Sequence, residues 1–94
     1  MQLGIVAGQV VSTIKLEGMG RHQLLLVDFV DAQGRPSGVR NVAADPLGAG
    51  NGEWVLLVSG SSARHASKGD QPIDLCVVGI VDQVVVGNDV AYRK

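Results

Sequence analysis

The stretch from Glu53 to Gly69, EWVLLVSGSSARHASKG, contains a predicted change from strand to helix, and this change decides the fold prediction. Its first part is a short run of aromatic, β-branched and aliphatic residues, which is typical of a strand. Its second part begins with a serine suited to an N-cap, continues with helix-forming residues and closes on Lys68 and Gly69. The stretch therefore predicts a strand at Glu53–Val58 and one short helix between Gly60 and Gly69.

Four further apolar runs surround this stretch, and none of them has a helical period. They predict strands at Leu3–Val11, Gln23–Val30, Val39–Ala44 and Leu75–Val86. Five short strands with a helix between the fourth and fifth favour an all-β fold, a small closed OB-like barrel, because closure removes exposed strand edges. An open β-sandwich fits the same pattern and stays open as an alternative.

Length and composition limit the classes of protein to which the chain can belong. The 94 residues form one hydrophobic core, so residues 1–94 are expected to be a single domain. A formal net charge of -1 argues against nucleic acid or an anionic membrane surface as a partner. The apolar runs are far shorter than the ~20 residues that cross a bilayer. The single cysteine and the absence of a signal-peptide pattern at the amino terminus predict a cytosolic protein.

Several predicted strands are apolar on both faces. In a small antiparallel barrel one face points inward and the other meets water, so polar residues should alternate with apolar ones. Instead, aliphatic residues are consecutive at Leu24–Val27, Leu56–Val58 and Val84–Val86. A contiguous apolar surface usually marks an interface, and the expected cover is a second copy of the chain. The alternative is that loops and the short helix fold over one outer face.

The sequence offers weak candidates for catalysis. Ser62 and His65 lie one helical turn apart and could form a small hydrolase site, but N-capping and an exposed helix face explain them better. Cys76 stands in an apolar strand without a visible activating base, so it is expected to be a buried core residue. No catalytic residue is predicted.

Ligand and metal sites are also weakly supported. His22 and His65 are far apart and there is one cysteine, so neither a metal site nor a cofactor is predicted. Backbone amides at Ser61–Ala63, beside Arg64, could hold an anion, which keeps a binding module for a small anionic or nucleic-acid ligand as an alternative function. The glycine density of Asp45–Gly52 indicates a tight backbone approach or positive φ. On that ground, a β-branched residue at Gly50 is expected to impair assembly with other copies of the chain more than it impairs strand formation.

Several blocks of the sequence, in order, resemble the shell vertex proteins of bacterial microcompartments, the group that includes carboxysome and ethanolamine-utilisation vertex proteins. The blocks are Gly8–Lys15, Leu24–Val27, Val42–Gly50, Glu53–Leu56, Gly60–Arg64 and Asp74–Asp82. The combination of an Asp-x-x-Gly-Ala-Gly loop with Gly-Ser-Ser-Ala-Arg is the most specific part of the resemblance.

The resemblance implies a structural protein, not an enzyme. It implies an OB-like barrel assembled into a homopentamer that closes the five-fold corners of a protein shell in the bacterial cytoplasm, with other shell proteins as partners. It also implies that two loops contribute to the subunit interface or to an axial opening. Their residues are Asp45, Gly48, Ala49, Gly50, Gly60, Ser61, Ser62, Ala63 and Arg64.

Overall fold

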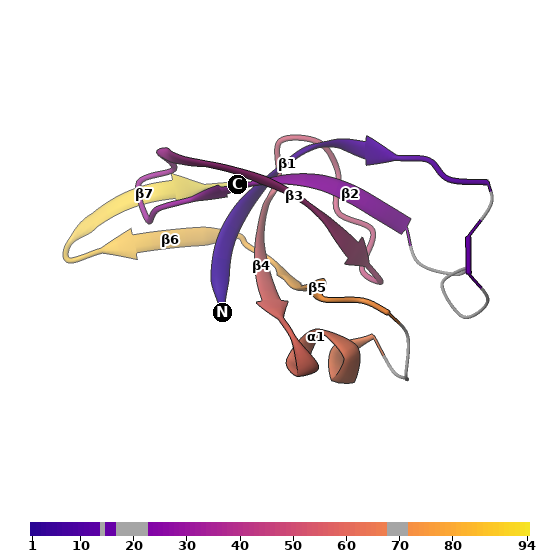
Figure 1. Cartoon of the computed structure of the whole chain (residues 1–94). Coiled ribbons are helices and arrows are strands. Elements are labelled where there is room, and N and C mark those ends of the chain that lie inside the picture. The colour runs from indigo at the N-terminus through magenta and orange to yellow at the C-terminus, as the bar shows by residue number, and fades with distance from the viewer. Residues whose placement is uncertain (14, 17–22, 68–71) are drawn as a thin grey trace.

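The computed structural model describes residues 1–13, 15–16, 23–67 and 72–94, and its centre is a closed barrel of five strands (Figure 1). The order around the barrel is β1-β2-β3-β5-β4. Strands β3 and β5 are parallel and all the other neighbours are antiparallel. The predicted OB-like barrel is confirmed. The strands are β1 Gln2–Val10, β2 Gln23–Val30, β3 Pro36–Asp45, β4 Trp54–Ser59 and β5 Leu75–Ile80.

The barrel interior is filled by one aliphatic face of each strand. Its buried residues are Val6, Leu25, Val27, Ala43, Ala49, Val55, Leu57, Leu75 and Val77. Little room remains around them: a Cβ added at Gly4 would lie 2.8 Å from Cδ1 of Leu57. Glycine is needed there because the backbone of β1 passes close to the Leu57 side chain of β4.

Helix α1, Ser61–Ala66, connects β4 to β5 and covers part of the outside of the barrel. Ala63 and Ile73 pack there against Ala44 and Cys76, with Leu24, Val58 and Ala66 at the margin. The predicted serine N-cap is wrong. Gly60 holds that position with φ 63°, and no side chain caps the helix. The predicted closing residues Lys68 and Gly69 lie outside the described residues.

The predicted fifth strand, Leu75–Val86, is wrong, because the chain bends at Val81 and Asp82. Beyond the bend, β6 Gln83–Val86 and β7 Asp89–Arg93 form a separate antiparallel hairpin. We call the hairpin, residues 83–93, the arm; Figure 1 shows it projecting from the barrel. The dipeptide Gly87–Asn88, between the valine run Val84–Val86 and the segment Asp89–Arg93, is a known hairpin signal that the strand prediction missed.

Smaller differences concern strand ends. Strand β3 begins at Pro36, three residues before its predicted start, at an exposed end of the strand, where a missing amide donor is tolerated.

Within the described part of the chain, no helix is long and apolar enough to span a bilayer.

Candidate subunit interface

The base of the arm is fastened to the barrel through Trp54, the first residue of β4. The rings of Trp54 and Tyr92 are stacked, with centroids 4.4 Å apart and planes inclined by 19°. Gly34 lies so close to the indole that a Cβ there would be 2.6 Å from Cζ2 of Trp54. Trp54 is 7% exposed, so Tyr92 closes an apolar surface that the barrel alone would leave open.

An Asx turn places Gly34 against the indole. The carboxylate oxygen Oδ1 of Asp31 accepts hydrogen bonds from the backbone N–H groups of Gln33 and Arg35, each 2.9 Å long. Gly34 has φ 84°, which favours glycine over residues with a side chain. The β2–β3 turn is therefore shaped to fit the aromatic pair at the base of the arm.

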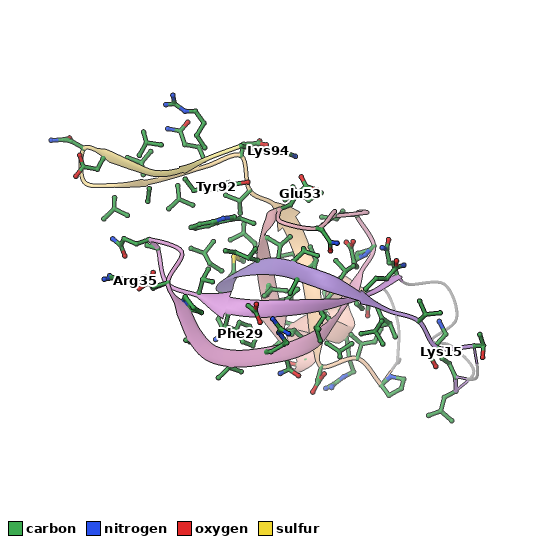
Figure 2. The ribbon with its side chains drawn as sticks, turned by 90° about the horizontal axis from the view of Figure 1, so that it is seen from above. Lys15, Phe29, Arg35, Glu53, Tyr92 and Lys94 are labelled. Atoms are coloured by element: carbon green, nitrogen blue, oxygen red, sulfur yellow. The ribbon has the colours of Figure 1, made fainter. Side chains whose placement is uncertain are left out.

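Glu53 connects the arm to the loop before β4. Its Oε2 is 2.5 Å from Nζ of Lys94, and its Oε1 accepts a 2.7 Å hydrogen bond from the backbone N–H of Gly50. The Lys94 ammonium, and then the Gly50 amide, lower the pKa of Glu53 from its usual value. Figure 2 shows Glu53, Tyr92 and Lys94 gathered where the arm leaves the barrel.

Asp45 organises the loop that the sequence singled out. Its carboxylate accepts hydrogen bonds from the backbone N–H groups of Leu47, Gly48 and Ala49, at 2.9, 3.1 and 2.7 Å. Asp45 is 3% exposed and Ala49 packs into the barrel interior. The carboxylate satisfies amides that would otherwise be unpaired, so Asp45 shapes the loop from within.

The expected role of Gly50 needs correction. Gly48 has φ 84°, whereas Gly50 is not in the positive-φ region. A Cβ at Gly50 would lie 3.4 Å from Oε1 of Glu53, which is an ordinary contact. Between Asp45 and Gly52, the conformational demand for glycine therefore falls on Gly48 and on Gly52, which has φ 83°.

The second predicted segment, Gly60–Arg64, begins α1 at the opposite end of β4. Ser61, Ser62 and Arg64 are exposed there, and Ala63 is fully buried under the helix. Ala63 packs in the outer cluster, whereas Ala49 packs inside the barrel. The structure thus places the two predicted loops at two ends of one strand.

Strands β1, β4 and β5 carry an apolar surface that stays partly exposed among the residues that the structure describes, and we call this surface the open face. Leu3 and Leu56 are register partners on β1 and β4, and both are partly exposed. The open face consists of Leu3, Leu56 and Val78, with Met1 at its margin near α1 and Val58 at its border with the outer cluster. The predicted apolar outer surface is therefore present on this side of the barrel.

The candidate chemical groups are not arranged as a reaction centre. In the described part of the chain, no hydrogen bond joins Ser62 to His65, and both side chains are exposed on α1. Cys76 is fully buried as predicted, and burial, with a smaller contribution from Asp45, raises the pKa of its thiol. Among residues 1–13, 15–16, 23–67 and 72–94, no three potential metal ligands lie together. His22 lies outside these residues.

Comparison with known proteins assigns this architecture to a family. The family described as "Ethanolamine utilisation protein EutN/carboxysome" matches residues 1–82. The chain belongs to the EutN/CcmL family. It is 54% identical over 95 residues to the bacterial microcompartment shell vertex protein EutN of Salmonella typhimurium, covering 100% of this chain and 96% of that protein.

Two further EutN/CcmL relatives extend the comparison. The carboxysome shell vertex protein CcmL of a Synechocystis species is 47% identical over 95 residues, covering 100% of this chain and 95% of that protein. The solved structure of GrpN, a pentameric microcompartment shell protein from Rhodospirillum rubrum, superposes with a TM-score of 0.83 at 46% identity, covering 94% of this chain and 100% of GrpN. These relatives are structural shell proteins, so the family supports neither a hydrolase nor a ligand-binding module.

Proposed function

We propose that this chain forms a homopentamer that closes the five-fold vertices of a bacterial microcompartment shell in the cytoplasm. Its relatives EutN and CcmL are named as shell vertex proteins, and GrpN is a pentameric shell protein. A chain of the same fold, matched over nearly its whole length, is suited to the same structural role. The other proteins of the shell are its expected partners.

The observation that carries this proposal is the open face. A pair of leucines, Leu3 and Leu56, lies side by side on the barrel wall, with Val58 and Val78 nearby. The described residues place no second layer over these side chains, whereas a neighbouring copy in a ring would remove them from water. A stable contact typically buries ~800 Å² per partner, which a strand face of a small barrel can supply.

We assign supporting roles to the two predicted loops. Asp45, Gly48, Ala49 and Gly50 form a loop whose shape is set internally, so it can present a fixed backbone surface to a neighbour. Ser61, Ser62 and Arg64 present exposed polar groups beside the open face, and Gly60 and Ala63 set the position of the helix that carries them. Both segments are proposed to line the subunit contact or the axial opening.

The chain is not expected to bind nucleic acid or membranes. The formal net charge of -1 gives no overall attraction to phosphate groups. Microcompartment shells are built from protein, so contacts between shell proteins are sufficient for the proposed role.

Native mass spectrometry of the full chain tests this function. The expected result is a dominant species of five subunits at micromolar concentration. A stable monomer or an unrelated stoichiometry at that concentration contradicts the proposal.

A matched pair of glycine variants tests the loop. Gly48→Val forces a β-branched residue into φ 84°, so it should weaken the pentamer; Gly50→Val should weaken it less because no such strain arises. Equal pentamer fractions for both variants and the wild type would show that the 45–50 loop is not part of the subunit interface.

A further inference from the structure

The turn that leads into β4 contains a chemically reactive pair of residues, Asn51 and Gly52. The side-chain amide of an asparagine can be attacked by the backbone nitrogen of the following residue. The attack is fastest when that residue is glycine, because glycine has no side chain to shield its nitrogen. Both residues are exposed in the turn, so water reaches the amide.

The other asparagines, Asn41 and Asn88, are less reactive by the same criterion. Asn41 lies in β3 and precedes Val42, whose β-branched side chain hinders attack by the Val42 nitrogen. Asn88 precedes Asp89, whose side chain shields the nitrogen and whose negative charge opposes loss of the backbone proton. Asn51 is therefore the asparagine with the most favourable neighbour.

In the folded chain the attacking nitrogen is already engaged. The N–H of Gly52 donates a 2.9 Å hydrogen bond to the carbonyl of Val6 in β1, and the N–H of Val6 donates a 3.0 Å hydrogen bond to the carbonyl of Glu53. The Gly52 nitrogen must lose its proton and approach Cγ of Asn51 to react, and the bond to Val6 opposes both changes. Val6 is 2% exposed in the barrel interior, so the core fixes this acceptor.

The turn is also held by its own hydrogen bonds. The N–H of Glu53 donates a 3.1 Å bond to the carbonyl of Gly50, and Oε1 of Glu53 accepts a 2.7 Å bond from the N–H of Gly50. Release of the Gly52 amide therefore requires local opening of the turn away from β1. Such openings occur in native proteins without global unfolding, so the turn can open while the barrel stays folded.

We propose that Asn51 is a site of spontaneous deamidation, and that the hydrogen bond from the Gly52 amide to Val6 keeps the reaction slow while the turn stays paired with β1. In the reaction, the Gly52 nitrogen bonds to Cγ of Asn51 and the Cγ–Nδ2 bond breaks. The side-chain nitrogen leaves as ammonia with the proton from Gly52. Water then opens the cyclic imide at either carbonyl, giving aspartate or isoaspartate at position 51.

Either product changes the turn. Both add a negative charge close to Glu53, in a chain whose formal net charge is -1. Isoaspartate also lengthens the backbone by one methylene before Gly52, so the Gly52 amide no longer fits the Val6 carbonyl in its present register. The product would thus mark chains in which this turn had opened.

Peptide mapping of the full chain by mass spectrometry tests the site. One sample is kept at mildly alkaline pH under native conditions and another in guanidinium chloride. In the denatured sample we expect Asn51 to react before Asn41 and Asn88, and in the folded sample to react about tenfold or more slowly. Earlier conversion of another asparagine in denaturant overturns the site, and equal rates at Asn51 in the two samples overturn the protection.

Glu53→Ala tests the protection, and Asp28→Ala is its matched control. Glu53→Ala removes the acceptor of the Gly50 amide, whereas Asp28→Ala removes a similarly exposed carboxylate that pairs with Arg40. We expect Glu53→Ala to speed conversion of Asn51 in the folded protein about threefold or more, with no change in denaturant, and Asp28→Ala to change neither rate.

The variants have outcomes that contradict the protection. No acceleration by Glu53→Ala, or equal acceleration by Asp28→Ala, overturns it. Circular dichroism checks that each variant is folded. If Glu53→Ala is not, Glu53→Gln takes its place and should give a smaller acceleration.

Dilution separates this inference from the proposed pentamer. The bond between Gly52 and Val6 lies within one chain, so the rate in the folded protein should be the same above and below dissociation of the ring. A rate that rises on dilution assigns the protection to a neighbouring copy and overturns the role of Val6. A wild type that is not pentameric contradicts the proposed function and leaves the chemistry of Asn51 unchanged.

Discussion

The two apolar patches on the outside of the barrel have similar sequence patterns but differ in burial. On one side, Cys76 and Ala44 are buried beneath Ala63 of α1 and Ile73. On the other side, Leu3 and Leu56 stay partly exposed next to a groove. Apolar residues on both strand faces thus predict that a second layer exists, but not whether the same chain supplies it.

The connections between strands account for the difference. Helix α1 is part of the link between β4 and β5, so the link crosses the outer surface near the ends of those strands and covers it. The arm follows β5 but is held away from the barrel by contacts at its base, which involve Trp54, Tyr92, Glu53 and Lys94. One side is therefore covered within the subunit, and the other stays partly exposed in the isolated chain, where we propose that a neighbouring copy covers it.

Ile73→Ala, on the side of the barrel that α1 covers, should give the largest effect, a loss in the free energy of unfolding. Ile73 is 6% exposed in the outer cluster, so its truncation should lower the free energy of unfolding by about 2–4 kcal/mol. Urea unfolding followed by circular dichroism measures the loss. The loss should be the same whether the protein is diluted below pentamer dissociation or not, because the contact lies within one subunit. A loss that vanished on dilution would show that Ile73 packs between subunits, and the two patches would then not differ as described.

Leu56→Lys should act on the open face, and mainly on assembly. Leu56 is partly exposed, and a lysine can extend its ammonium into water in the isolated chain, so the barrel should fold nearly as well as the wild type. In the ring the charge would be buried, so the concentration for half dissociation should rise about tenfold or more. Analytical ultracentrifugation measures this rise. A large loss of stability in the dissociated subunit would show that the open face is part of the monomer core.

Labelling of Cys76 with a thiol reagent should distinguish the two sides by accessibility. The thiol is fully buried and its pKa is raised, chiefly by burial, so the wild type should react slowly in the folded state. Ile73→Ala should speed the reaction by roughly tenfold or more, because opening of the outer cluster becomes easier. Leu56→Lys serves as the control and should leave the rate unchanged. Faster labelling in both variants would mean that the two sides open together.

Lowering the pH should give the smallest effect, a change in Trp54 fluorescence at the base of the arm. The pKa of Glu53 is lowered by Lys94 and by the Gly50 amide, so its contribution to stability is complete above its ordinary value of 4.5. This contribution is lost as the pH falls through the lower pKa of the folded state. Trp54 fluorescence should therefore change below about pH 4.5 in the wild type, and Glu53→Gln should show the altered signal already at neutral pH. Because the pair is exposed to solvent, the change should be small and weaker at high salt.

Much of the fold could be predicted from local patterns. The strand at Gln23–Val30 has the predicted ends, and the helix between β4 and β5 and the burial of Cys76 are confirmed. The Leu75–Val86 prediction failed because consecutive valines conceal the bend at Asp82, while the turn at Gly87–Asn88 was overlooked. In the Asp45 loop, the sequence predicted positive φ or close backbone approach among the glycines and chose Gly50 for the test, whereas the positive φ occurs at Gly48 and Gly52.

The sequence by itself determined that this chain is an all-β domain with more aliphatic strand surface than one small core can bury, because alternation and turn chemistry are local properties. Only the tertiary structure decided which side α1 covers, that Trp54 is enclosed by Tyr92 and Gly34, and that Glu53 joins the Asp45 loop to Lys94. These contacts join segments far apart along the chain, and their distances depend on closure of the barrel, which no local pattern encodes.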